Sequence, residues 1–549
     1  MTRLFIGNKP GVGGVVKVMV NDADDPLTTP NANYSKFKFN SESTDIGYIS
    51  ETYTKQWNVS SYPCPSGAQS YYLYYPNGGT NLTATDIVLS WTYGGTTSTA
   101  LEQHFVINFS KKYGFNYPPI FEVRRKLSSG RFSKGHDAYS QVSGFEAGSY
   151  YFYGNLVFSS HSARTWKSSS GGFRGFTNGY FHYKRVYEDF GTKIGSSGDY
   201  MGAISFSGND GIQFEQFLNR SDTALASIWE LPANNTPLPA ASSPVGGQKN
   251  VVFSPTLVRI SMAGYDVNTA DRNHLILDST KVPAKIIKTG EIFVPANGSA
   301  TVNTPSEFPL NGNVYVDYIG WESSQPLYIP YYKFAVADFS NSEIVIDYQI
   351  ATNSVTFFNI RANGLTIRYM IIADDDTPPS TGGGKVIDTQ SSYVRILRPG
   401  SNSANPSWSD ILLDTRLSYL PILAEGYIPI GSFVSNTVNV PQLGAKKSEI
   451  TFANGGLKPF LKFSAEMSDG SFMPPVIRKS VSNWNSSLTV AIYRHSIFAS
   501  LTDTGAIFYT NPTGPADVYF DNAIPNFVSD NDSGPSVVGV RYYVLGLKI

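Results

Sequence analysis

Apolar and polar residues alternate over short stretches along much of the chain, and this alternation predicts β-strands. In one stretch Val314, Val316 and Tyr318 fall on one face of an extended segment, and Tyr315 and Asp317 fall on the other. Clusters of Gly, Asn, Asp and Pro separate such stretches at intervals of about ten residues. Short strands joined by turns at this spacing predict antiparallel β-sandwiches.

A long block of this pattern occurs twice, 136 residues apart and without a gap. The first copy carries Val258-Arg259-Ile260, Gly264, Leu275-Ile276-Leu277-Asp278, Gly290 and Ile292, and the second carries Val394-Arg395-Ile396, Gly400, Ile411-Leu412-Leu413-Asp414, Gly426 and Ile428. A fainter copy opens the chain, where Pro10-Gly11 parallels Pro399-Gly400 and Phe37-Lys38-Phe39-Asn40-Ser41 parallels Leu275-Ile276-Leu277-Asp278-Ser279. A unit used three times predicts a modular scaffold rather than a single catalytic pocket.

Further strands recur inside the repeated block. Residues 366–372 and 539–545 each form an apolar strand with an Arg-Tyr pair, and each closes a copy. An aromatic segment that precedes prolines occurs at residues 105–110 and 460–464, with a looser version at residues 314–318. We expect these three segments to be one element shared by the copies.

Two stretches rich in Pro, Gly, Ser and Ala precede the later copies and predict linkers, at residues 233–250 and 375–386. The chain has 549 residues, too many for one hydrophobic core. The linkers divide it into an elaborated N-terminal β domain, residues 1–232, and two β-sandwich modules, residues 251–374 and 387–549. The predicted fold class is therefore all-β, with tandem antiparallel β-sandwich modules.

Composition agrees with strands and narrows the partners. The chain holds 34 Phe, 35 Tyr, 49 Gly and 33 Pro, and only 15% of its residues are charged, which favours sheets and turns over helices. With 42 basic and 43 acidic residues the net charge is −1. A neutral chain has no general attraction for nucleic acid, so we expect no nucleic-acid partner.

The sequence also bears on the cellular compartment. Residues 1–7 lack the long apolar stretch of a secretory signal, and no segment approaches eighteen uninterrupted apolar residues. We expect synthesis in a host cytoplasm without a signal peptide, and no membrane span. Cys64 is the only cysteine, so no disulfide forms within the chain.

Aromatic residues gather in the N-terminal domain outside the repeat. We single out a candidate binding surface, which consists of Tyr71, Tyr72, Tyr74, Tyr75, Tyr151, Tyr153, Trp166, Phe173 and Tyr180. On loops, such side chains stack on sugar rings or anchor protein partners. In a sheet, the same residues would simply build the core.

The chain lacks the motifs of the common enzyme classes. It has no phosphate-binding Gly-rich loop, no His-Glu-x-x-His and no Gly-x-Ser-x-Gly elbow, and its six histidines are scattered. We predict no catalytic residue, no cofactor and no metal ligand. A glycosidase needs only two carboxylates that meet in space, and Glu146, Glu188, Asp189 and Asp199 keep that alternative open.

Two acidic segments, residues 21–25 and 530–534, contain oxygen ligands of the kind that calcium uses. Neither closes with the glutamate of a calcium-binding loop, so ordinary polar turns are the preferred interpretation. Whether either segment binds calcium stays open.

One charged relationship recurs with the repeat. Arg259 and Asp278 of the first copy correspond to Arg395 and Asp414 of the second. If the strands that carry them pair, each Arg and Asp would form an ion pair that sets the register. A catalytic role would hardly be duplicated, so the structural interpretation is preferred.

The repeated unit resembles the small modules of minor tail and tail-tip proteins in tailed bacteriophages. The shared features are Val-Arg-Ile, a Gly turn, an apolar triplet ending in Asp, a Pro-containing aromatic segment and a closing Arg-Tyr strand. The resemblance covers residues 257–373 and 393–546, and residues 3–122 loosely. It implies a virion component near the tail tip, baseplate or fibre, which assembles with other tail proteins and with copies of itself.

The leading hypothesis is thus a non-enzymatic virion structural protein of a phage tail, with a role in assembly and in attachment to a host glycan or protein. One alternative is a glycan-binding or glycan-cleaving protein of the tailspike kind. Another is a bacterial surface adhesin, which the missing export signal disfavours.

Overall fold

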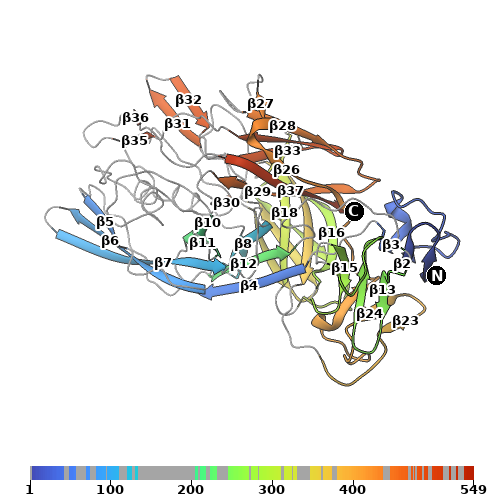
Figure 1. Cartoon of the computed structure of the whole chain (residues 1–549). Coiled ribbons are helices and arrows are strands. Elements are labelled where there is room, and N and C mark those ends of the chain that lie inside the picture. The colour runs from blue at the N-terminus through green and yellow to red at the C-terminus, as the bar shows by residue number, and fades with distance from the viewer. Residues whose placement is uncertain are drawn as a thin grey trace.

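The structure is a computed structural model of residues 1–549 (Figure 1). It describes residues 3–42, 48–56, 70–74, 82–93, 96–109, 120–126, 130–133, 204–207, 211–217, 223–230, 245, 247–270, 274–281, 283–310, 314–323, 326–329, 346–359, 363–373, 380–436, 446–467, 472–473, 475, 479–484, 487–492, 497–510, 518–520, 527–529 and 537–549. Strands between residues 48 and 126 and between 204 and 230 are described by their backbone alone.

The protein is all-β, as the alternating pattern predicts. Strands account for 55% of the described residues, and every described strand pair is antiparallel. The helical elements of this part of the chain are single 3₁₀ turns, namely η1 (Tyr34–Lys36), η4 (Trp408–Asp410) and η5 (Ile430–Ser432). We call residues 1–232, 251–374 and 387–549 modules 1, 2 and 3.

Each module contributes one small three-stranded sheet. The sheets are β1 (Arg3–Lys9), β2 (Gly13–Met19) and β3 (Phe37–Asn40); β13 (Val251–Phe253), β14 (Val258–Ser261) and β15 (Leu275–Asp278); and β23 (Ile387–Thr389), β24 (Val394–Leu397) and β25 (Ile411–Asp414). Their registers match: Lys17 faces Asn40, Arg259 faces Asp278, Arg395 faces Asp414, and each pairing then shifts by one residue. The faint N-terminal repeat is therefore a genuine third copy.

In each of the three sheets a side-chain hydroxyl bonds a backbone amide at the equivalent position, and the three sheets share one apolar core. Ser41, Ser279 and Thr415 follow the last strand of each sheet, and their hydroxyls accept the amides of Val16, Val258 and Val394 at 3.0 to 3.1 Å. Apolar side chains from all three sheets then meet in one cluster, which includes Val16, Phe39, Ile260, Leu277, Ile396 and Leu413. The three sheets share a single core.

A second three-stranded unit also occurs three times. Its copies are β4 (Tyr48–Gln56), β12 (Thr223–Glu230) and β8 (Ile120–Lys126); β16 (Lys285–Val294), β22 (Leu365–Ala373) and β18 (Val314–Trp321); and β26 (Ile422–Pro429), β37 (Val537–Leu547) and β29 (Lys458–Met467). The first strand of each copy carries a one-residue bulge near its start. The closing Arg-Tyr strands, β22 and β37, are the middle strands of their three-stranded units.

Glycine and tyrosine face each other across these strands. Gly290 lies opposite Tyr369, and Gly426 lies opposite Tyr542. A Cβ added to Gly290 would be 2.5 Å from the Tyr369 hydroxyl oxygen, so the tyrosine ring occupies the space that a side chain would need. This explains why the glycine and the Arg-Tyr strand recur together.

The third repeated unit links the modules. It consists of β10 (Ile204–Ser207), β11 (Gly211–Phe217) and β7 (Thr96–Phe109); β20 (Asp347–Ala351), β21 (Ser354–Asn359) and β17 (Gly298–Asn303); and β33 (Ile497–Leu501), β34 (Gly505–Thr510) and β28 (Lys446–Thr451). A short strand of each module pairs with this unit in another module. The strand β9 (Phe132–Ser133) of module 1 pairs with β20 of module 2, β19 (Leu327–Ile329) of module 2 with β33 of module 3, and β30 (Phe472–Met473) of module 3 with β10 of module 1. The three modules thus exchange strands in a closed cycle.

The sheets consequently cross the predicted module boundaries. The nine-stranded sheet joins modules 3 and 1, the seven-stranded sheet joins modules 1 and 2, and the five-stranded sheet joins modules 2 and 3. The residue ranges 1–232, 251–374 and 387–549 share sheets in the structure, and in each module a strand of a neighbouring module covers a sheet edge.

Two parallels drawn from the sequence are wrong in position. Pro10-Gly11 lies in the turn between β1 and β2, whereas Gly400 follows β24. Residues 105–110 belong largely to β7, whereas residues 460–464 lie on β29, whose counterpart in module 1 is β8. Residues 314–318 lie on β18, which is the counterpart of β29 and its residues 460–464.

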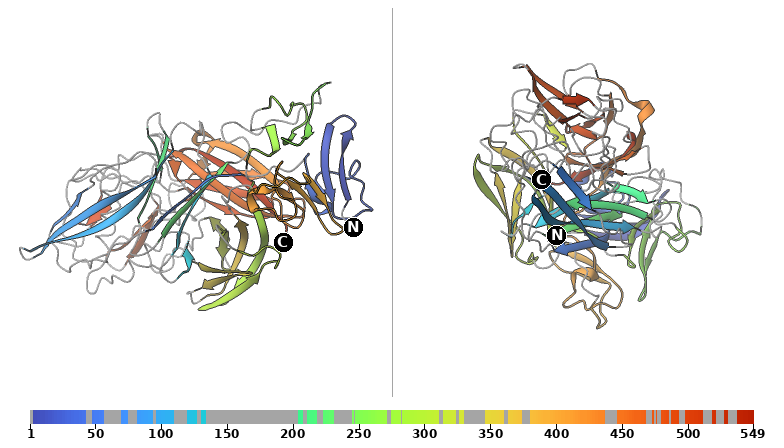
Figure 2. Two further views of the ribbon diagram at one scale, coloured as in Figure 1. Left: turned by 90° about the horizontal axis from the view of Figure 1, so that it is seen from below. Right: turned by 90° about the vertical axis from the view of Figure 1, so that its left-hand side faces the viewer.

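Additional strands distinguish modules 1 and 3. They are β5 (Ser70–Tyr74), β6 (Leu82–Tyr93), β27 (Val434–Ser435), β31 (Lys479–Trp484), β32 (Ser487–Ile492), β35 (Val518–Phe520) and β36 (Phe527–Ser529). Strands β5, β6, β31, β32, β35 and β36 gather at the end of the molecule opposite both termini (Figure 1; Figure 2, left). We call this end the elaborated end and the other, which carries the three small sheets, the repeated end.

Candidate functional site

The aromatic candidate surface falls at the elaborated end as far as it is described. Tyr71, Tyr72 and Tyr74 lie on β5, beside the long hairpin of β6 and β7. Tyr75, Tyr151, Tyr153, Trp166, Phe173 and Tyr180 lie outside the described residues, as do Cys64 and the carboxylates Glu146, Glu188, Asp189 and Asp199.

The first acidic segment is a hydrogen-bonded turn. Asp25 accepts the amide of Leu27 at 3.0 Å and the hydroxyl of Thr28 at 3.1 Å, and Asp24 pairs with Lys36 at 3.1 Å. The amide of Leu27 lowers the pKa of Asp25. Within the described ranges no group of three or more His, Cys, Asp or Glu side chains could hold a metal ion. Residues 530–534 lie outside them.

The repeated Arg and Asp take different partners in the two copies. Arg259 donates from Nε to Asp278 at 3.1 Å, across the paired strands β14 and β15. Arg395 also faces Asp414 in register, but its guanidinium bonds Asp388 on β23 at 2.8 Å, and Asp414 bonds Arg416 at 2.5 Å. The position is thus charged and structural in both copies, while the partner varies.

A buried ion pair connects modules 2 and 3 at equivalent positions. Asp317 on β18 faces Met370, and Lys462 on β29 faces Tyr543; both lie one pair from the Arg-Tyr site of their sheets. Lys462 Nζ donates to Asp317 Oδ2, and the side chains are 6% and 1% exposed. Because both side chains are buried, either charge without the other would lower the stability of the fold. The sequence gives each residue as a polar position on an apolar strand, but not their contact.

A cavity with a volume of about 180 Å³ lies between modules 1 and 3. Its lining consists of Tyr34, Phe37, Lys38, Thr415, Leu417, Ser418, Tyr419, Pro421, Leu457, Gly546 and Lys548. Tyr419 fixes one wall, because its hydroxyl donates to the carbonyl of Phe37 at 3.0 Å. The chain end forms another wall, where the Lys548 carbonyl accepts the Thr289 hydroxyl at 2.5 Å. We call this cavity the Lys38 pocket.

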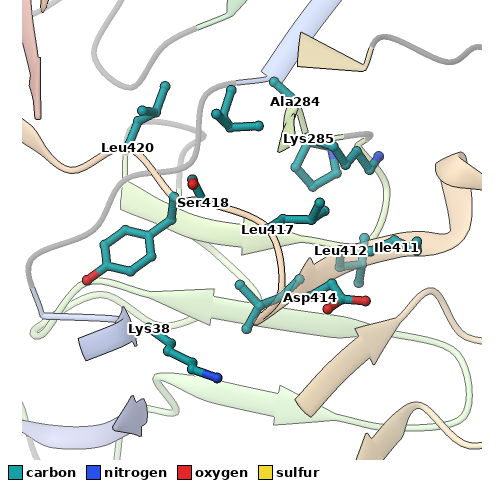
Figure 3. Close-up of a pocket in the computed structure, with 13 residues that line it drawn as sticks. Lys38, Ala284, Lys285, Ile411, Leu412, Asp414, Leu417, Ser418 and Leu420 are labelled. Atoms are coloured by element: carbon teal, nitrogen blue, oxygen red, sulfur yellow. The ribbon is translucent and has the colours of Figure 1, made fainter. Parts of the chain in front are cut away.

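A smaller hollow of about 50 Å³ adjoins the Lys38 pocket and shares Lys38, Leu417, Ser418 and Tyr419 with it. Lys38 and Lys285 lie on opposite sides of this hollow, with Leu417 and Asp414 between them (Figure 3). Three modules therefore meet here, since Lys285 belongs to module 2.

Lys38 is held in a partly buried, positively charged setting. Burial lowers the pKa of Lys38, the positive charge of Lys548 lowers it further, and Asp414 raises it. The equivalent positions in the other small sheets are Ile276 and Leu412, each only 3% exposed. Lys38 therefore replaces a core residue of the repeat. The sequence alignment of residues 37–41 with 275–279 already shows this substitution, although the pocket beside it is visible only in the fold.

Comparison with known proteins yields no relative: no family model, no curated protein and no solved structure matches the chain. Among the residues that the structure describes, no helix has the length and apolar character to cross a membrane.

Proposed function

We propose that this chain is a non-enzymatic structural protein of the virion, built into the tail of a tailed bacteriophage at the tip, baseplate or fibre attachment point. One observation supports this most: three copies of one module exchange strands in a closed cycle within a single chain. Such a construction commits the repeated strands to a rigid frame, which is typical of a scaffold. The resemblance of the module to tail-tip modules agrees with it.

The two ends of the molecule suggest how the roles divide. The repeated end carries both termini and three sheets of one design, which suits docking to other tail proteins or to further copies of the chain. The elaborated end carries the long hairpin of β6 and β7, 12 and 14 residues in length, which extends over about 45 Å. We assign contact with a host glycan or protein to this end, because binding elements typically project from a scaffold.

Electron microscopy of intact particles tests the assignment to the tail. Density that fits the three small sheets of the repeated end against neighbouring tail proteins is the expected result. Absence of this chain from purified virions, shown by mass spectrometry, would remove the proposal.

A binding assay tests the role of the elaborated end separately. The purified chain is incubated with host cells and with their extracted surface glycan, beside a variant in which Tyr71, Tyr72 and Tyr74 are replaced by Ser. Binding that this variant loses and that a control variant, Tyr265→Ser at the repeated end, retains is expected. New reducing ends released from the glycan would instead favour a glycan-cleaving enzyme.

A further inference from the structure

We propose that the Lys38 pocket binds a small apolar monocarboxylate. The first ground is the departure of Lys38 from its own repeat. Ile276 and Leu412 fill the equivalent positions with buried apolar side chains that belong to the shared core. Module 1 places an ammonium group there instead, next to an open cavity of about 180 Å³. A change from core hydrocarbon to charge at a cavity wall weakens packing, so it calls for a compensating role.

The second ground is the charge around the pocket. Lys38 and Lys548 both line it, and Asp414 lines the adjoining hollow beside Lys38. Burial is the main cause of the lowered pKa of Lys38, and the positive charge of Lys548 lowers it further. A bound anion would relieve this repulsion and form a charge-assisted hydrogen bond. Asp414 lies beside Lys38 and already pairs with Arg416, and its carboxylate would repel a phosphate with several negative charges more than a ligand with one.

The third ground is the size and surface of the cavity. Phe37, Leu417 and Leu457 form apolar parts of its wall, and the rings of Tyr34 and Tyr419 add flat surface. An apolar cavity of about 150 Å³ holds a benzene molecule. The Lys38 pocket is slightly larger, which accommodates one ring or a short branched chain with its carboxylate directed to the lysines.

Calorimetric titration of the full chain with benzoate tests the proposal. We expect saturable binding that is weakened about tenfold or more by Lys38→Met, which is the loss expected when one hydrogen bond to a charged group is removed. Lys548→Met should weaken it as well. Lys249→Met is the control, because Lys249 is exposed and lies outside the pocket, and its binding should equal that of the unchanged chain.

Two further ligands separate the contributions of charge and ring. Benzyl alcohol should bind more weakly than benzoate, and benzylamine should not bind. N-acetylphenylalanine distinguishes two sources of the carboxylate ligand. Tighter binding than that of benzoate would indicate the carboxyl end of a peptide, and weaker binding would indicate a free acid. Thermal unfolding of each variant shows whether its fold is retained.

Three outcomes would overturn the proposal: no heat with benzoate, equal affinity for benzoate and benzylamine, or unchanged affinity in folded Lys38→Met and Lys548→Met. None of them bears on the assignment to a phage tail.

Discussion

Single glycines on β16 and β26 make room for tyrosines on the neighbouring strands β22 and β37. Gly290 and Gly426 leave room for Tyr369 and Tyr542, whereas the first module reverses the pair, with Tyr53 opposite Ala226. In every copy one member is tyrosine and the other is small. The constraint is therefore one of volume across two strands, and it does not depend on which strand carries the ring.

Replacing Gly290 by Ala should destabilise the protein. The new Cβ would lie 2.5 Å from the Tyr369 hydroxyl oxygen and 2.8 Å from its ring, so a buried side chain must move. Overpacking of this kind lowers the free energy of unfolding by about 1–3 kcal/mol. Urea denaturation measures it. Gly431→Ala is the matched control, since its Cβ meets nothing within 4 Å, and equal midpoints for the two variants would contradict the volume argument.

Two buried tyrosines predict a loss of stability at high pH. Burial raises the pKa of Tyr328 and of Tyr369 to about 12, against about 10 in an unfolded chain. Between these values the folded protein keeps protons that the unfolded chain releases, so stability should fall as pH rises from about 10 to about 12. Denaturation midpoints across this range measure the fall. A double variant, Tyr328→Phe with Tyr369→Phe, should show a shallower fall; an unchanged slope would contradict the assignment.

At the level of strands, the sequence predicts the strands themselves and the pairing of near neighbours, but it does not predict the pairing between strands of different modules. Alternation, turn residues and the 136-residue offset locate β14, β15, β24 and β25 and the closing strands β22 and β37. The exchanged strands β9, β19 and β30 are only two or three residues long. Their partners lie in another module, and no periodicity within a stretch so short specifies a partner.

The contacts in the candidate sites also divide into local ones, which the sequence predicts, and distant ones, which it does not. The Arg259 to Asp278 bond joins neighbouring strands of one sheet, as the repeat predicts, whereas Arg395 and Asp414, which the repeat predicts to pair in the same way, bond Asp388 and Arg416 instead. Asp317 and Lys462 stand 145 positions apart and meet only because modules 2 and 3 adjoin. The Lys38 pocket likewise forms where β3 meets the segment after β25. Contacts between modules form only when the three modules are assembled, and the sequence of a single segment does not specify them.

The Asp317 to Lys462 contact predicts strong coupling between β18 and β29. Lys462→Met should lower the free energy of unfolding by about 3–5 kcal/mol, because it leaves a buried carboxylate without its cation. Adding Asp317→Leu to it should restore much of the loss, since an apolar pair removes both charges. Chemical denaturation of the single and double variants measures the coupling.

Lys458→Met on the same strand provides the control. Its pair with Asp503 is exposed, and the loss should stay below about 1 kcal/mol. Additive effects of Asp317→Leu and Lys462→Met would show that the two side chains do not interact.

At the scale of the whole molecule, the modules hold together through sheets and cores rather than through linkers. Tyr328 of β19 packs on Phe498 of module 3, Phe132 stacks on Tyr348 of module 2 with ring centroids 5.2 Å apart, and Tyr419 bonds the backbone of module 1. One apolar cluster draws on β16, β18, β19 and β22 of module 2 and on β26, β29, β33, β34 and β37 of module 3. These interfaces have the character of a domain interior, so covalent continuity between the modules should be dispensable once the protein has folded.

Cutting the chain between modules 2 and 3 tests this directly. A protease site inserted between Gly382 and Gly383, both exposed, allows cleavage of the folded protein. The two pieces should migrate together in size-exclusion chromatography at the position of the uncut protein, which has a mass of 60.1 kDa. Their midpoint of unfolding should fall and become dependent on concentration, because the cut removes only the high effective concentration that the linker supplied. Separation of the pieces in native buffer, with the uncut insertion variant intact as a control, would mean that the exchanged strands do not hold the cycle closed.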